Sequence, residues 1–324
     1  MTASNPPATY RIIDRLHIDH AAEISRLIGG LRTSPATIEP KYFYDPLGCA
    51  LYAAICQLDE YYPTRTERAI FQQYRGEISA LIDERGGGGT FVDLGAGDCC
   101  KAMSWLPFIR PRRYLAIDIA GPSLASALAN MAPEFPEIEM IGLVTDFSQT
   151  LDIPPELLSA PTTLFYPGSS IGNFTPPAAT QFLRQMRDCT KNGGLLIGVD
   201  AKKDKRRLDA AYADALGVTA AFNLNALRHI NRVIDADFNE SQWRHVGAYN
   251  EQLGRIEMHL ESIVEQSVMI GGSARRFARG ERIHSENSYK YSRDEFEAML
   301  VAAGFSDINV WTNDEQAFWV FYAH

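Results

Sequence analysis

Hydrophobic and polar positions follow two alternating patterns along the middle of the chain. Short runs that are almost wholly apolar predict buried strands, and longer segments with apolar residues three or four positions apart predict amphipathic helices. The apolar runs cover residues 90–94, 113–118, 138–144, 162–166 and 195–200. Helical spacing covers residues 66–82, 122–131 and 177–189, and a further helix starts at Lys101 and is cut short by Pro107 and Pro111. This alternation predicts an α/β fold with a mostly parallel sheet.

The end of the chain breaks the alternation. Residues 293–303 predict a helix that ends at Gly304, and residues 306–312 and 317–322 predict two strands with no helix between them. Strands joined directly pair antiparallel, so we expect one antiparallel strand at the edge of the sheet. This arrangement is typical of class I S-adenosylmethionine (SAM) methyltransferases, which have a Rossmann-like, mostly parallel seven-stranded sheet.

Residues 201–291 separate the fifth strand from the last helix and are too many for a loop. They show helical spacing over residues 208–216 and 218–233 and alternation over residues 255–268. We expect an inserted α+β lobe that covers the carboxyl edge of the sheet. The expected division is a nucleoside-binding domain of residues 63–200 plus 292–324 and a substrate-binding lobe of residues 12–62 plus 201–291.

A glycine turn follows the first strand, and a carboxylate ends the second. Gly95 and Gly97 allow the backbone to turn sharply and to approach a ligand where a Cβ would collide. Asp118 is placed to accept hydrogen bonds from both hydroxyls of a ribose, although a plain polar strand end also explains it. Together these residues predict a nucleoside site.

The nucleoside belongs to SAM or to NAD. A dinucleotide fingerprint continues as GxGxxG, whereas here Gly97 is followed by Asp98, Cys99 and Cys100. The motif also lies deep in the chain, and no second nucleotide-binding half follows it. We therefore predict SAM, with NAD as the alternative.

Three further residues stand near this site in the sequence. Asp146 and Phe147 follow the third strand, where an acceptor for the adenine amine and a stacking ring belong, and an ordinary turn explains them equally well. Lys101 is the lone cation close to the glycine turn. It either pairs with the carboxylate of SAM or is a solvated helix lysine.

Composition limits the classes of partner. The 324 residues are 46% hydrophobic, enough for a substantial core. The net charge of −9 argues against a nucleic-acid partner, since phosphate binding needs a basic face. No apolar run approaches the roughly 20 residues of a membrane span, and the first seven residues lack the features of a signal peptide. We expect a cytoplasmic protein that acts as a monomer on a small molecule, without nucleic acid or membrane.

Cysteine and histidine spacing predicts no metal site. The five cysteines form no CxxC pair, which fits a reducing compartment. The seven histidines show neither HxxxH nor HxH spacing. Cys99 and Cys100 are better explained as small residues that line a turn than as reactive thiols.

Several longer motifs resemble those of the L-histidine Nα-methyltransferases of ergothioneine biosynthesis (the EgtD family). They span residues 41–48, 60–67, 168–173, 217–223, 255–258 and 286–288. The run over residues 60–67, Glu-Tyr-Tyr-Pro-Thr-Arg-Thr-Glu, is long and unusual and therefore the most specific. The resemblance covers essentially the whole chain after about Thr33. It implies a two-lobed enzyme that uses SAM to methylate the α-amine of free histidine three times, giving hercynine and S-adenosylhomocysteine.

The resemblance also implies roles for individual residues. Tyr62, Glu286 and Ser288 would hold the imidazole, Asn173 and Tyr212 the substrate carboxylate, and Met258 would form an apolar wall beside the ring. The SAM contacts it implies are Tyr44, Gly95, Lys101, Asp118, Asp146 and Phe147. One departure is visible, because the relatives carry small hydroxylated residues where this chain has Asp98-Cys99-Cys100.

Methyl transfer from a sulfonium requires chiefly that the amine lone pair lie about 3 Å from the carbon, opposite the leaving sulfur. An α-amine has a pKa near 8, and a nearby sulfonium favours its neutral form further. We therefore expect no dedicated base, with Tyr44 and Asn173 orienting the amine or a water.

Ring recognition is the more demanding task. Glu286 and Ser288 stand two apart on an extended segment and so point to the same side, although a surface strand pair would show the same spacing. Glu286 would accept a ring N–H and hold the imidazole positively charged. Two alternatives remain: the same fold and cofactor acting on another amino acid such as a tryptophan derivative, and a SAM-binding protein without catalytic activity.

Overall fold

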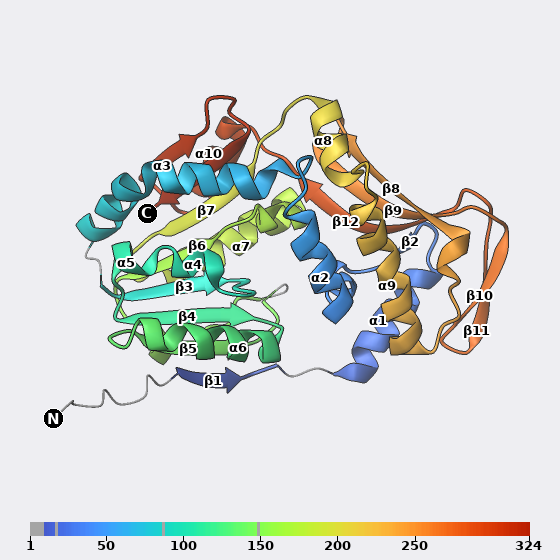
Figure 1. The fold of residues 1–324 in the computed structure, drawn as a ribbon, viewed down its shortest axis with the longest axis horizontal. Helices are drawn as coiled ribbons and strands as arrows, with labels where there is room; N and C mark the ends of the chain where they lie inside the picture. The colour runs from blue at the N-terminus through green and yellow to red at the C-terminus, as the bar shows by residue number, and fades with distance from the viewer. Residues whose placement is uncertain (1–9, 17–18, 86–87, 148–149) are drawn as a thin grey trace.

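The computed structural model describes residues 10–16, 19–85, 88–147 and 150–324. Its centre is an eight-stranded sheet (Figure 1). In spatial order the strands are β1 (Tyr10–Asp14), β5 (Glu139–Val144), β4 (Arg113–Asp118), β3 (Thr90–Leu94), β6 (Thr162–Tyr166), β7 (Leu195–Asp200), β14 (Phe318–Ala323) and β13 (Ile308–Thr312). Every neighbouring pair from β1 to β7 is parallel, and β14 is antiparallel to both of its neighbours. The class I methyltransferase fold is confirmed.

The structure corrects three details of this sheet. The described residues form eight strands in it and not seven, because β1 pairs in parallel with β5. Residues 12–14, which the sequence assigns to the substrate-binding lobe, therefore lie in the main sheet. The antiparallel strand β14 lies between β7 and β13 and not at the edge.

Helices cover both faces of the main sheet. They are α3 (Tyr62–Glu84), α4 (Cys100–Met103), α5 (Leu106–Ile109) and α6 (Gly121–Met131) on one face, and α7 (Pro176–Cys189) and α10 (Arg293–Ala302) on the other. Side chains alternate between the two cores along each strand: Phe91 packs with α3 and α5, and Val92 packs on the side of α7. The helix predicted from Lys101 is two short helices, with Pro107 in the first turn of the second.

The remaining elements form the lobe at the right of Figure 1. Its helices are α1 (His20–Arg32), α2 (Pro46–Ile55), α8 (Lys205–Tyr212) and α9 (Val218–Ile234). A four-stranded sheet joins β2 (Ala36–Thr37), β12 (Arg282–Tyr289), β9 (Arg255–Ser262) and β8 (Trp243–Asn250), and β10 (Gln266–Ile270) and β11 (Ser273–Phe277) form a hairpin. The lobe also has two short 3₁₀ helices, η1 (Pro40–Phe43) and η5 (Glu240–Gln242), while η2 (Ala132–Glu134), η3 (Pro155–Leu157) and η4 (Ser170–Asn173) pack with the main sheet. The lobe has a hydrophobic core of its own.

The predicted lobe elements differ from the observed ones at their ends. The helix expected over residues 208–216 ends at Tyr212, because the Asp214 carboxylate accepts the backbone N–H groups of Val218 and Thr219 and starts the next helix instead. The alternation over residues 255–268 divides into β9 and β10. Across the described part of the chain, no helix is both long and apolar enough to cross a membrane.

Gly198, in the middle of β7, leaves no space for a side chain. A Cβ there would lie 2.0 Å from Glu67 Oε1 and 3.0 Å from the Phe318 ring. We expect Gly198→Ala to lower the free energy of unfolding by about 3 kcal/mol, because overpacked cores must shift their neighbours. Gly76→Ala is the control, since Gly76 lies in α3 with open space around it, and alanine there should stabilise by about 0.5–1 kcal/mol. Urea unfolding measures both; equal effects would contradict the close packing of β7.

Candidate active site

A pocket lies where the carboxyl ends of β6 and β7 meet the inserted lobe. Open α/β sheets bind ligands at this edge. Of the twelve residues predicted for the site, six line the pocket: Tyr44, Asn173, Tyr212, Met258, Glu286 and Ser288. These residues come from five separate stretches of the chain, and the fold brings them together around one pocket.

Tyr62 does not line this pocket. Its side chain is 1% exposed, and its hydroxyl donates to both oxygens of Asp200 at 2.8 Å. The preceding residue, Tyr61, lines the pocket instead. The two tyrosines stand at the start of α3, where neighbouring side chains point in different directions, so Tyr61 and not Tyr62 lines the pocket.

Strand β12 places the residues predicted to recognise the ring. Glu286 lies opposite Met258 of β9 in the antiparallel register, and Ser288 lies opposite Ile256. A register shift between His284 and Glu286 lets this part of the strand face the pocket. The carboxylate and the thioether side chain therefore meet on one wall, next to Ser288.

Burial raises the pKa of Glu286 to about 7. The value in an unfolded chain is near 4.3, so the folded protein binds this proton more tightly than the unfolded one. Folding stability from this group is therefore greatest at acid pH and falls as the pH rises from about 4.3 towards 7. A ¹³C NMR titration of glutamate carboxyls in the ligand-free protein should show one group that titrates near 7. That signal should be missing in Glu286→Gln; an unshifted Glu286 would contradict the prediction.

Lys290, which directly follows the last residue of β12, also lines the pocket and was not predicted from the sequence. Its ammonium donates to Ser288 Oγ at 2.9 Å and to Tyr212 Oη at 3.0 Å. Tyr212 Oη in turn donates to Ser288 Oγ at 3.1 Å. Tyr212, assigned to the substrate carboxylate, thus contacts the serine assigned to the ring.

Asn173 is held at the end of η4. This 3₁₀ helix packs closely on β12, since a Cβ at Gly172 would lie 2.7 Å from the carbonyl oxygen of Tyr289. The tight approach fixes Asn173 at the pocket wall that the main sheet contributes.

The glycine turn, Asp118 and Phe147 gather beside the carboxyl ends of β3 and β4. Gly95 and Gly97 have φ values of +71° and +54°, and Gly97 N donates to Asp118 Oδ2 at 2.8 Å. The Phe147 ring lies 3.8 Å from the position a Gly95 Cβ would take. Asp146 directly precedes Phe147, two residues after the end of β5.

Lys101 connects the glycine turn to the pocket. Its ammonium lies 2.7 Å from Glu67 Oε2 and 3.1 Å from the position of a Gly168 Cβ. Glu67 Oε1 accepts the backbone N–H of Gly168 at 2.6 Å, and Gly168 lines the pocket. Glu67 was not predicted as a site residue, although it ends the unusual run over residues 60–67.

The comparison with known proteins decides the family. Residues 23–324 match the family model described as histidine-specific, SAM-dependent methyltransferase. The chain belongs to this family. It is 37% identical to the histidine N-alpha-methyltransferase of Mycolicibacterium smegmatis, over 94% of this chain and 96% of that protein. The histidine N-alpha-methyltransferase of Mycobacterium tuberculosis is 34% identical, over 91% and 92%. The 4-dimethylallyltryptophan N-methyltransferase of Trichophyton verrucosum is 26% identical, over 97% and 96%.

The cofactor of this methyltransferase is SAM, as predicted, and not NAD. The residues around the glycine turn fit it. Positive φ values at Gly95 and Gly97 leave the backbone open to a ligand. The carboxylate of Asp118 lies at the end of β4, where a ribose is bound in folds of this kind.

The two cysteines that follow the glycine turn, Cys99 and Cys100, differ in exposure: one thiol is buried and the other is exposed. Cys99 is 1% exposed, and burial raises its pKa to about 12. Its thiol is therefore protonated at neutral pH and packs as a small apolar group. Cys100 is exposed at the first position of α4.

Proposed function

We propose that the protein catalyses the SAM-dependent Nα-methylation of free L-histidine, three times over, to give hercynine in ergothioneine biosynthesis. The observation that carries the proposal is the joint placement of Glu286, Ser288 and Met258 on one wall of the pocket. A carboxylate, a hydroxyl and an apolar side chain suit a small ring with two nitrogens. The names of the Mycolicibacterium and Mycobacterium relatives support the same substrate.

Bound SAM supplies an electrophilic methyl group, and the residues of this chain position the amine. Asp118 would hold the ribose hydroxyls, with Phe147 and Asp146 at the adenine and Lys101 at the methionine carboxylate. Asn173 would donate to the carboxylate of histidine, whereas Tyr212 gives its single hydroxyl hydrogen to Ser288 and would line the pocket beside it. The hydroxyl oxygen of Tyr44, which lines the pocket, would orient the amine by accepting one of its N–H groups, and the amine lone pair would stay free to attack the methyl carbon. No described side chain is then needed as a strong base.

A tryptophan derivative is the second candidate substrate, because one relative is named for methylation of 4-dimethylallyltryptophan. The pocket favours histidine over it. An indole has one N–H and no acceptor nitrogen, so it would satisfy Glu286 and leave Ser288 without an acceptor. It also needs more room beside Met258, which is 2% exposed.

The test is incubation of the purified protein with methyl-labelled SAM and a panel of free amino acids, followed by mass spectrometry. We expect histidine to gain three labelled methyl groups and tryptophan derivatives to gain none. Methylation of an indole amino acid in place of histidine would establish the second candidate. Tight SAM binding with no turnover of any amino acid would point to a non-catalytic protein.

The proposed function also assigns a task to each of the two parts of the molecule. The main-sheet residues would form the SAM-binding domain, and the lobe of residues 19–62 and 201–291 would bind the substrate. We further propose that the enzyme acts as a monomer in the cytoplasm. Light scattering of the purified protein tests the monomer, and fractionation of cells tests the compartment.

A further inference from the structure

Each of the three N–H groups of the Lys290 ammonium has a hydrogen-bond partner. Its side chain is 1% exposed. Its Nζ lies 2.8 Å from Asp200 Oδ2, 3.0 Å from Tyr212 Oη and 2.9 Å from Ser288 Oγ. An ammonium has three N–H groups and no acceptor, so these three partners account for all of its hydrogen bonds. Lys290 has no role in the proposed binding of SAM or histidine.

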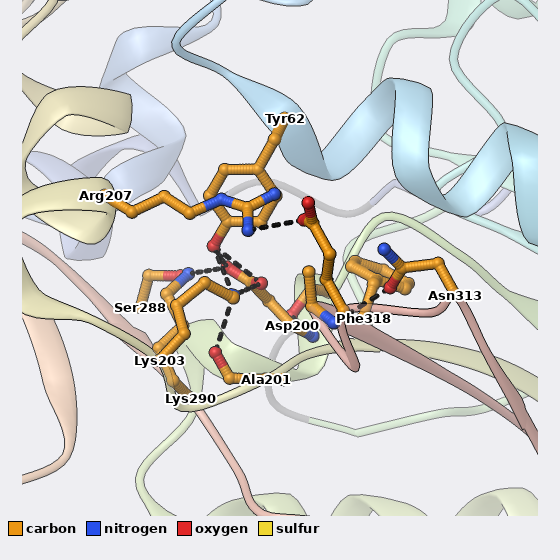
Figure 2. A network of polar contacts seen from close by, with 12 residues as sticks. Tyr62, Asp200, Ala201, Lys203, Arg207, Ser288, Lys290, Asn313 and Phe318 are labelled. Atoms are coloured by element: carbon orange, nitrogen blue, oxygen red, sulfur yellow. Dashed lines mark hydrogen bonds and ion pairs between the residues drawn. The ribbon is translucent and has the colours of Figure 1, made fainter.

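Asp200 keeps this ammonium charged. The carboxylate is fully buried at the end of β7, and it also accepts hydrogen bonds from Tyr62 and Lys203, as Figure 2 shows. Contact with Lys290 and Lys203 outweighs burial and lowers the pKa of Asp200. The same ion pair raises the pKa of Lys290. Lys290 is therefore a permanent donor to both hydroxyls that face the pocket.

These contacts determine which hydrogen bonds the Ser288 hydroxyl accepts and which it can still donate. A serine hydroxyl has two acceptor lone pairs and one hydrogen. Ser288 Oγ accepts from Lys290 and from Tyr212, which uses both lone pairs. Its hydrogen meets no acceptor among the residues that the structure describes, and the side chain lines the pocket. Ser288 is left as a donor to whatever the pocket binds.

We propose that Lys290 is a positioning residue that fixes Ser288 as a hydrogen-bond donor to the substrate ring, and this rests on the proposed function. The bound ring must then present an unprotonated nitrogen to Ser288 and an N–H to Glu286. Only the neutral imidazole, in one tautomer, has both. The pocket therefore selects the neutral ring, and not the positively charged ring that Glu286 alone would favour.

A purely structural role for Lys290 has to be separated from this one, because the Asp200–Lys290 pair also joins the end of β7 to the segment that follows β12. Lys203 provides the matched control. Its ammonium contacts the same Asp200, together with Tyr62 and the carbonyl oxygen of Ala201. It donates no hydrogen bond to Ser288 or Tyr212, so Lys203→Met disturbs the ion cluster and leaves the hydrogen bonds of the serine unchanged.

The first experiment uses the unaltered protein. Histidine labelled with ¹⁵N in the ring is bound in the presence of S-adenosylhomocysteine, and ¹⁵N NMR reports the protonation of each ring nitrogen. We expect one protonated and one unprotonated nitrogen at a pH near 6, where much of the free histidine is imidazolium. A bound ring with both nitrogens protonated would overturn the proposal.

The second experiment compares histidine with the two isomers of pyrrolylalanine, which keep one ring N–H and replace the other nitrogen by C–H. In the wild-type enzyme we expect kcat/KM to favour histidine over the better isomer by about 10- to 100-fold, because Ser288 loses its acceptor. In Lys290→Met, Ser288 can turn its hydrogen to Tyr212, so the two substrates should become nearly equal. Lys203→Met should keep the wild-type preference.

The outcomes separate the two proposals. A preference that is absent in the wild type or unchanged in Lys290→Met overturns the role of Lys290. Wild-type protein that does not turn over histidine overturns the proposed function instead. If circular dichroism shows that Lys290→Met does not fold, the NMR experiment on the unaltered protein decides.

Discussion

Replacing Glu286 with alanine should lower kcat/KM for histidine by about 30- to 800-fold, the largest loss that we expect from any single pocket residue. The substrate ring N–H would face Met258 and an empty space instead of a carboxylate. Loss of a charge-assisted hydrogen bond in a desolvated site costs about 2–4 kcal/mol. Initial rates measured over a range of histidine concentrations, with SAM saturating, give the ratio.

Glu257→Ala is the matched control for this variant. Glu257 lies on the adjacent strand β9, next to Met258, and its carboxylate pairs with Arg255 and not with the pocket. Its removal should leave kcat/KM for histidine within about threefold of wild type, as for a surface ion pair. Normal histidine affinity in Glu286→Ala would refute the assignment of this pocket to the imidazole.

The second large effect is expected at Asp118. Asp118→Ala removes the acceptor proposed for the ribose hydroxyls and also the partner of the Gly97 and Ala120 backbone N–H groups, at 2.8 and 2.9 Å. We expect the dissociation constant for SAM to rise by about 100-fold, since two hydrogen bonds to a charged group are lost. Isothermal titration calorimetry with S-adenosylhomocysteine measures the change without turnover.

Glu139→Ala serves as the control for Asp118. Glu139 begins the neighbouring strand β5 at the opposite edge of the sheet, where it pairs with Arg113 near the surface. This variant should bind S-adenosylhomocysteine as tightly as the wild type. If Asp118→Ala also binds it normally, the nucleoside site lies elsewhere.

The sequence predicted the central strands well because they are buried on both faces. β3, β4, β6 and β7 begin and end at the predicted residues, since parallel strands covered by helices are continuous apolar runs. The edge strand β1 has no such signal. Its side chains are mostly exposed, and only backbone pairing with β5 defines it.

The site was predictable where its residues share one strand. Glu286 and Ser288 stand two apart on β12, so their common direction follows from the sequence. The same rule extends to Lys290, but its partner Asp200 is 90 positions away and gives no local signal. Tyr61 and Tyr62 are alike in type and neighbours in sequence, and only the direction in which α3 starts decides which of them reaches the pocket.

The buried pair of Asp200 and Lys290 also bears on how molecules enter and leave. A motion that parted the main sheet from the lobe would have to pull this pair open, and leaving one of its charges unpaired costs about 3–5 kcal/mol. We therefore expect substrates to enter and products to leave through the opening of the pocket beside Tyr44, which is 42% exposed. Variants designed to accept bulkier amino acids should therefore change residues around this opening and keep the ion pair between Asp200 and Lys290.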